Sequence, residues 1–156
     1  MEIFYYKSPI GVLEIICKKN ELVSLKLVDK TGLSIKETDF IKNIKSQLDE
    51  YFKNKRKVFD ISLNPKGTDF QKRVWKELLK IPYGETKSYS EIAAAVKSPK
   101  AQRAVGSACN KNPIMIIIPC HRVISKNGNT GGFACGTFVK LKLLDTEQHY
   151  STSKSK

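Results

Sequence analysis

The spacing of apolar residues changes along this chain from the period of a β-strand to that of an α-helix, and this change limits the folds that the chain can adopt. Over residues 21–28 apolar and polar side chains largely alternate, which is the period of a β-strand. Segments 2–6 and 12–17 are also typical of strands. Turn sequences, Ser8-Pro9-Ile10-Gly11 and Lys19-Asn20, separate the three. The first part of the chain is therefore predicted to form a small antiparallel sheet.

From Thr38 the period becomes helical. The apolar residues that share one helical face are Phe40, Ile41, Ile44, Leu48, Tyr51 and Phe52. Residues 53–57 are a charge run, most simply a solvated loop, and residues 58–63 suggest one more short strand. Residues 64–67 have the composition of a linker. We therefore predict an N-terminal domain over residues 1–63 and a second domain over residues 64–150.

The second domain is predicted to be mainly helical. Capping-box patterns at Thr68 and Ser88 each place Glu or Gln three residues on, and Ser98 with Pro99 suggests the start of a third helix. Two short helices joined by a tight turn indicate a helix-turn-helix. On its second helix Arg103 and Ser107 project together, so this face could press on DNA. An ordinary surface helix with a solvated arginine is the alternative.

Composition limits the partners and the compartment. The net charge of +13 and pI of about 9.6 favour a polyanion partner, and solubility alone is the alternative explanation of the many lysines. No apolar run approaches the length of a membrane span, and the N-terminus lacks a signal-peptide layout, so we expect a cytoplasmic protein without membrane contact. Four cysteines without a CxxC pair, and only two histidines, argue against zinc and for free thiols.

Residues 114–124 carry the strongest chemical signal. An apolar run is followed by Pro119, Cys120, His121 and Arg122. A histidine or a cation near a cysteine favours its reactive thiolate form. The pattern predicts a thiol at the end of a buried strand that Pro119 terminates. A buried core cysteine is the alternative. A glycine-rich loop follows over residues 126–136, then a helix over about residues 138–147. A polar tail over residues 151–156 is expected to be disordered.

Several motifs keep the order and spacing of a known family. They are Thr68-Asp69-Phe70-Gln71, Val74-Trp75, Ile81-Pro82-Tyr83-Gly84-Glu85-Thr86, Ser88-Tyr89, Arg103-Ala104-Val105-Gly106, Lys111-Asn112-Pro113, Pro119-Cys120-His121-Arg122-Val123 and Leu143-Leu144 with Glu147. From about residue 64 to residue 149 the chain resembles the O6-alkylguanine-DNA alkyltransferases. The resemblance implies an α/β (α+β) fold, in which a small ribonuclease-H-like sheet-plus-helix domain precedes a winged-helix-like, mainly helical domain.

The resemblance also implies a reaction. Cys120 would accept the methyl group of O6-methylguanine, with O4-methylthymine as a second candidate substrate, in one irreversible transfer. His121 and Glu147 would activate the thiol through a water molecule, and Asn112 would tie the helix-turn-helix to the active-site loop. In family members no cofactor takes part, and the metal site of some relatives has no counterpart residues here.

Further residues take their roles from the same resemblance. Tyr89 would help rotate the nucleotide and Arg103 would fill the gap left by the flipped base, while the helix carrying Ser107 would lie in the minor groove. The carbonyls of Cys120 and Val123 would read the guanine amino group. Phe133 and the backbone N–H of Ala134 would lie near the substrate. Met115 replaces a proline of relatives that accept bulky groups, and Arg122 is expected to pack structurally, in an ion pair. The implied partner is double-stranded DNA containing O6-alkylguanine, bound by a monomer.

Two other classes of function remain open from the sequence. One is a non-catalytic module that binds alkyl damage, although relatives of that kind lack the cysteine. The other is a thiol hydrolase that uses Cys120 and His121. A hydrolase turns over many times, whereas an alkyltransferase stops at about one methyl group per protein, because a thioether is not hydrolysed.

Overall fold

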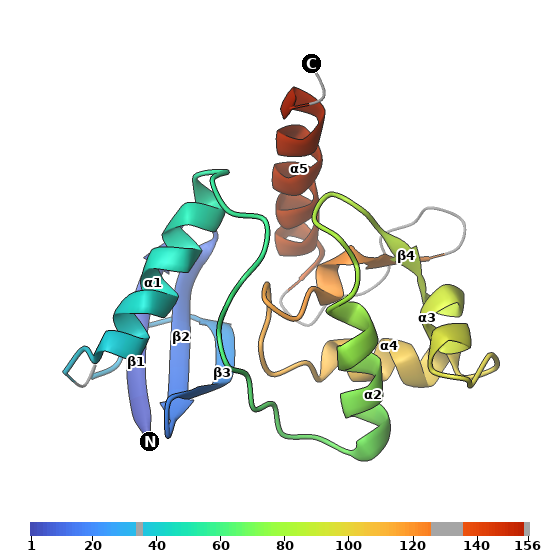
Figure 1. The fold of residues 1–156 in the computed structure, drawn as a ribbon, viewed down its shortest axis with the longest axis horizontal. Coiled ribbons are helices and arrows are strands. Elements are labelled where there is room, and N and C mark those ends of the chain that lie inside the picture. The colour runs from blue at the N-terminus through green and yellow to red at the C-terminus, as the bar shows by residue number, and fades with distance from the viewer. Residues whose placement is uncertain (34–35, 126–135, 155–156) are drawn as a thin grey trace. The chain divides into compact units, whose positions relative to one another are not determined.

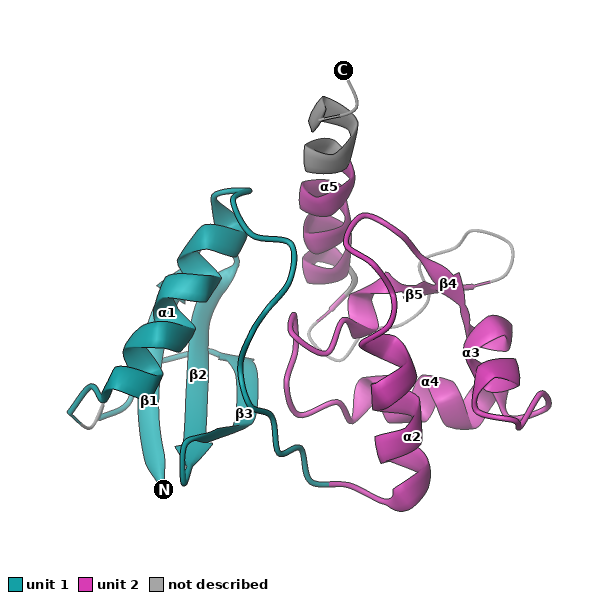
Figure 2. Ribbon diagram, viewed as in Figure 1, with its two compact units in different colours: residues 1–66 teal, residues 67–156 magenta. Residues whose placement is uncertain are grey.

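The computed structural model describes residues 1–33, 36–125 and 136–154. The chain divides into two compact units, Met1–Lys66 and Gly67–Lys156, coloured separately in Figure 2. The division falls inside the linker-like segment at residues 64–67. The mixed α/β class is confirmed, with a small sheet in the first unit and mainly helices in the second.

The first unit is a three-stranded antiparallel sheet with one helix packed on it (Figure 1). Strands β1 (Glu2–Ser8), β2 (Gly11–Lys18) and β3 (Glu21–Val28) follow one another as hairpins, with Leu13 of β2 opposite Tyr6 and Leu27. Helix α1 (Asp39–Phe52) begins at Thr38, whose side chain accepts the Ile41 N–H. The fully buried core residues of this unit include Leu13, Ile15, Leu25, Ile41, Ile44 and Leu48. This core combines the alternation of the strands with the helical period of α1.

The prediction of an extra strand over residues 58–63 is wrong. Only one isolated bridge, Leu22 to Leu63, joins this segment to the sheet. The side chain of Gln47 on α1 donates to the Asp60 carbonyl at 3.0 Å and accepts the Asp60 N–H at 2.8 Å. The Gln47 side chain thus occupies the N–H and the carbonyl of Asp60, which a continuous β-ladder would use. The sequence of residues 58–63 alone does not reveal this contact.

The second unit contains most of the helices. They are α2 (Asp69–Leu78), α3 (Tyr89–Ala95), α4 (Gln102–Asn110) and α5 (Thr137–Lys154), with a short 3-10 turn η1 (Cys120–Arg122) and two-residue strands β4 (Lys87–Ser88) and β5 (Val123–Ile124). Both predicted capping boxes are confirmed, at Thr68 and at Ser88. The indole N–H of Trp75 donates to the Ala108 carbonyl at 2.9 Å, so α2 is pinned to the end of α4. None of the described helices has a stretch apolar and long enough to cross a membrane.

Two predicted helix boundaries are wrong. Helix α4 begins at Gln102 rather than at Ser98, because Lys97 has a positive φ of 63° and the Ala101 N–H bonds back to the Ser98 carbonyl in a turn. Helix α5 continues past Glu147, where its apolar pattern ends, to Lys154. It therefore includes residues that the sequence assigned to the polar tail.

Candidate active site

The segment that presents Cys120 is buried but is not the strand that the sequence predicted. Residues 114–118 are at most 6% exposed, yet their only strand-type pairing is a single bridge position at residue 114. Two three-residue turns fold them: the Ile117 N–H bonds to the Met115 carbonyl, and the Cys120 N–H to the Ile118 carbonyl, both at 2.8 Å. The first turn puts Ile116 at φ 71°, a strained value for a β-branched residue. Cys120 follows as the first residue of η1, and this residue is 3% exposed.

Asn112 holds this irregular segment together. Its side-chain amide donates to the Ile118 carbonyl at 2.8 Å, and its carbonyl oxygen accepts the Ile114 N–H at 3.0 Å. Asn112 lies just beyond the last residue of α4. One side chain therefore connects the end of the helix-turn-helix to the segment that carries Cys120.

His121, Arg122 and Glu147 form a buried cluster. His121 Nε2 lies 2.6 Å from Glu147 Oε2. Arg122 donates from Nε to Glu147 Oε1 at 2.8 Å and from its second terminal nitrogen to Oε2 at 3.1 Å, which confirms the expected ion pair. A third donor of Arg122 reaches the Ile81 carbonyl at 2.7 Å. His121 is fully buried, Glu147 is 1% exposed and Arg122 is 6% exposed.

The cluster fixes the protonation states of its members. Burial alone would raise the pKa of Glu147, but the charge and the hydrogen bond of His121, followed by the hydrogen bonds and charge of Arg122, outweigh it and lower that pKa to about 2. Burial lowers the pKa of His121, and Arg122 and Lys140 add to that effect, against the opposing Glu147 charge. The stable state at neutral pH is thus an ionised Glu147 with a neutral His121 whose proton lies on Nε2. Nδ1 of His121 has no hydrogen-bond partner in the described part of the chain.

The parallel pair β4–β5 brings Tyr89 to the same region. Val123, directly after η1, pairs with Lys87, and Ser88 pairs with Ile124, so the first residue of α3 starts beside the cysteine turn. Figure 1 shows β4 running into α3. Burial raises the pKa of Tyr89 to about 12, and the thiols of Cys109 and Cys120 contribute. Tyr89 is therefore a phenol, and a hydrogen-bond donor, at neutral pH.

Lys140 is a site residue that the sequence reading missed. It is fully buried on α5, where its ammonium donates to the Val123 carbonyl at 2.6 Å and lies 5.7 Å from the centre of the Tyr89 ring. Burial lowers its pKa, which the neighbouring thiols of Cys109 and Cys120 partly offset. One signal could have found it: Lys140 precedes Glu147 by two helical turns, so both lie on one face of the helix.

The remaining predicted residues divide between those on α4 and those on the glycine-rich segment. Arg103 and Ser107 are exposed on α4, away from the buried cluster, and no described contact joins them to it. Between them, a Cβ added at Gly106 would lie 3.8 Å from the Tyr89 ring, so α4 and Tyr89 are close. Phe133, Ala134 and the glycine-rich loop around them lie outside the described residues.

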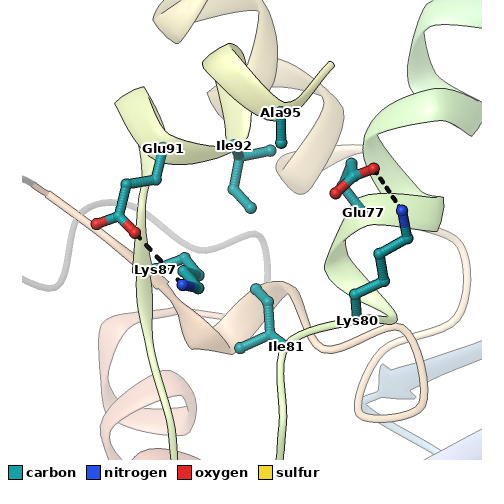
Figure 3. Close-up of a pocket in the computed structure, with 7 residues that line it drawn as sticks. All are labelled: Glu77, Lys80, Ile81, Lys87, Glu91, Ile92 and Ala95. Atoms are coloured by element: carbon teal, nitrogen blue, oxygen red, sulfur yellow. Dashed lines mark hydrogen bonds and ion pairs between the residues drawn. The ribbon is translucent and has the colours of Figure 1, made fainter. Parts of the chain in front are cut away.

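A pocket of about 260 Å³ opens elsewhere in the second unit (Figure 3). Its apolar residues are Ile81, Ile92 and Ala95, and the ion pairs Lys80–Glu77 and Lys87–Glu91 stand on either side. None of the predicted site residues lines it. The described residues contain no group of three or more His, Cys, Asp or Glu side chains arranged to hold a metal ion.

Comparison with known proteins covers both units. Residues 3–65 match the ribonuclease-like domain of 6-O-methylguanine DNA methyltransferase, and residues 69–149 match its DNA-binding domain. The methylated-DNA–protein-cysteine methyltransferase of Methanosarcina barkeri is 44% identical over 92% of this chain and 94% of its own. The constitutive enzyme of that name from Bacillus subtilis is 52% identical over 72% of this chain and 69% of its own.

The solved structures agree with the sequence comparisons. A crystal structure of OGT from Mycobacterium tuberculosis in complex with DNA has a TM-score of 0.87 and 41% identity, and it covers 96% of this chain and 94% of its own. An O6-methylguanine DNA methyltransferase from Methanococcus jannaschii has a TM-score of 0.69 and 29% identity over 93% of each chain. The chain belongs to the 6-O-methylguanine DNA methyltransferase family.

Proposed function

We propose that this protein repairs DNA by moving the methyl group of O6-methylguanine onto the sulfur of Cys120, once per molecule. The observation that carries this proposal is the buried Cys120-His121 turn, with His121 bound to Glu147 at 2.6 Å inside the matched DNA-binding domain. Relatives at 44% and 52% identity carry the name methylated-DNA–protein-cysteine methyltransferase. A binding module without chemistry would have no need of the thiol.

The reaction is an in-line displacement at the methyl carbon. The sulfur of Cys120 forms a bond to that carbon, the bond from the carbon to O6 breaks, and its electron pair stays on the guanine. The thiol proton passes through a bridging water to Nδ1 of His121. That assignment is supported because Nε2 is engaged by Glu147, while Nδ1 is buried without a partner in the described residues. Glu147 orients the ring and stabilises the imidazolium that forms.

Tyr89 and Lys140 act on the guanine side of the reaction. The Tyr89 hydroxyl donates a hydrogen bond to the purine as negative charge develops there. The buried ammonium of Lys140 adds positive charge to the same region and binds the Val123 carbonyl. A carbonyl oxygen has two lone pairs, so the Val123 carbonyl can still accept the guanine amino group, as the family resemblance implies.

DNA binding belongs to the α3–α4 pair. Arg103 and Ser107 are exposed on α4, where they can enter a groove, and Arg103 fills the gap after the damaged nucleotide leaves the stack. The space beside Gly106, where an added Cβ would lie 3.8 Å from the Tyr89 ring, gives a short path from that groove to the cysteine turn. Double-stranded DNA containing O6-alkylguanine is the partner, and one protein molecule acts on one lesion as a monomer. A reducing cytoplasm suits the three described cysteines, all free thiols.

The decisive test uses an oligonucleotide duplex that contains one O6-methylguanine. After incubation with the wild-type protein, mass spectrometry should find one added methyl group, located on Cys120. Cys120→Ala should take up none and still bind the duplex, because it removes the acceptor without touching α3 or α4. Cys17→Ala, at a buried cysteine of the other unit, is the control and should react as the wild type does.

The outcomes separate the rival functions. More than one guanine restored per protein molecule would indicate a turning-over hydrolase. An unmodified wild-type protein that binds the duplex would indicate a binding module. Methylation of the Cys120→Ala variant would contradict the assignment of the acceptor.

A further inference from the structure

Arg122 is a buried charge that the transfer mechanism above does not use. Its guanidinium contacts both oxygens of Glu147, at 2.8 Å and 3.1 Å, and the Ile81 carbonyl at 2.7 Å. It also lies 5.7 Å from the centre of the Tyr83 ring. A guanidinium fork that grips both oxygens of one carboxylate fixes its position and its charge.

The charge balance of the cluster depends on this arginine. Glu147 accepts hydrogen bonds from His121 and from Arg122, so either residue could supply the positive charge that a buried carboxylate requires. With Arg122 present, the carboxylate is already neutralised. His121 then needs no proton on Nδ1.

The other groups around His121 do not replace Arg122. Helix α5 packs against the turn and brings the charged side chains of Glu147 and Lys140 toward His121. Helix α2 also packs against the turn, and its buried face is apolar, with Val74, Trp75 and Leu78. Lys140 donates to the Val123 carbonyl. Arg122 is the cation whose guanidinium contacts both oxygens of Glu147.

We infer that Arg122 is a positioning residue for methyl transfer: by neutralising Glu147, it keeps His121 uncharged, with Nδ1 able to accept the thiol proton. This inference rests on the proposed function, because it assigns the base of that reaction. Without the guanidinium, a lone buried carboxylate would hold His121 as an imidazolium. An imidazolium cannot take a proton from Cys120, so transfer would require a higher pH.

The test compares pH profiles of single-turnover transfer from the O6-methylguanine duplex, between about pH 5 and about pH 9. Arg122→Gln removes the charge, so the acidic fall of the rate should move upward by about one pH unit or more, which is about a tenfold loss on the acidic side. At the alkaline end its rate should approach that of the wild type. Arg122→Lys retains the charge but not the fork, so its profile should lie between the two.

Two further variants make the result specific. The double variant Arg122→Gln with Glu147→Gln removes both charges, so the pKa of His121 should fall back from the value in Arg122→Gln. Arg56→Gln is the matched control, because Arg56 also binds one carboxylate and one carbonyl, those of Glu50 and Val58, but in the other unit. Its profile should match the wild type.

A second measurement does not depend on activity. The chain has two histidines, so ring-labelled protein gives two NMR titrations, and His149 serves as the internal reference. The pKa of His121 should rise in Arg122→Gln and return toward the wild-type value in the double variant. Equal losses of rate at every pH, with an unchanged His121 titration, would overturn the inference. A wild-type protein that leaves Cys120 unmethylated would instead overturn the proposed function, and the titration would still test the role of Arg122.

Discussion

His121 and Glu147 make the stability of this protein depend on pH in one direction. The folded state lowers the pKa of His121 from 6.5. Just below pH 6.5, His121 is therefore protonated in the unfolded chain but not in the folded one. The folded state also lowers the pKa of Glu147 from 4.5 to about 2, so the unfolded chain again protonates first. Stability contributed by Glu147 is present above about pH 4.5 and is lost as the pH falls toward 2.

We therefore predict that the free energy of unfolding falls as the pH is lowered from about 6.5, by at most about 1.4 kcal/mol per pH unit for each group. Urea unfolding at a series of pH values measures it, followed by the fluorescence of Trp75, the single tryptophan. In His121→Asn the free energy of unfolding should no longer change between about pH 6.5 and 4.5. In His149→Asn it should still fall over that interval. A wild-type stability independent of pH over that interval would contradict the prediction.

Single residues were predictable from the sequence where a short motif names them. Cys120, His121 and Glu147 stand in family motifs, and the structure joins His121 to Glu147 as the resemblance implied. Arg122 and Lys140 were not assigned a role in the chemistry. Their proposed roles depend on contacts between the turn η1 and helix α5, which are far apart in the sequence. The helical spacing of Lys140 and Glu147 was the one local signal of such a contact.

At the scale of elements, Asn112 controls the geometry of the segment before Cys120. That segment contains a strained residue, Ile116, whose positive φ is a conformation disfavoured by about 1–3 kcal/mol. The two hydrogen bonds of Asn112, to the Ile118 carbonyl and from the Ile114 N–H, help to hold it there. Without them the segment would relax and displace the sulfur.

Asn112→Asp tests this because it keeps the acceptor for Ile114 but loses the donor to Ile118. We predict a destabilisation of about 1–3 kcal/mol, as for a buried polar group left unpaired, and a slower transfer at every pH. The measurements are urea unfolding and single-turnover transfer. Asn110→Asp, at an exposed position on the same helix, is the control. A variant with wild-type stability and rate would show that Asn112 does not position the segment.

The success of prediction for elements follows the range of the interactions that form them. Capping boxes at Thr68 and Ser88 were predictable because both partners lie within one helical turn. The strand at residues 58–63 was not, since Gln47, more than ten residues away, takes its backbone groups. The apolar run before Cys120 has the composition of a strand, but Asn112 and two tight turns fold it otherwise.

On the scale of the whole molecule, the positive charge is unevenly distributed. The second unit holds 15 of the 28 basic residues but only 6 of the 15 acidic ones, so it carries +9 of the net +13. We predict that binding to undamaged duplex weakens steeply between about 50 and about 200 mM salt, by roughly a thousandfold if about six phosphates are neutralised. Fluorescence anisotropy with a labelled duplex measures this.

A pair of variants locates the DNA-binding unit. Lys100→Gln, at the exposed turn before α4, should reduce the slope of log affinity against log salt by about one. Lys18→Gln, at an exposed position of the first unit, should leave the slope unchanged. The reverse pattern would place the DNA on the other unit.

The burial of Cys120 has a consequence for which molecules reach its sulfur. A cysteine that is only 3% exposed is shielded from reagents in solution, including the oxidants and electrophiles that consume accessible thiols. We expect iodoacetamide to modify Cys120 far more slowly in the folded protein than in urea. Burial of Cys120 would therefore protect its thiol from side reactions, so that each molecule keeps its single methyl acceptor until it binds a damaged base.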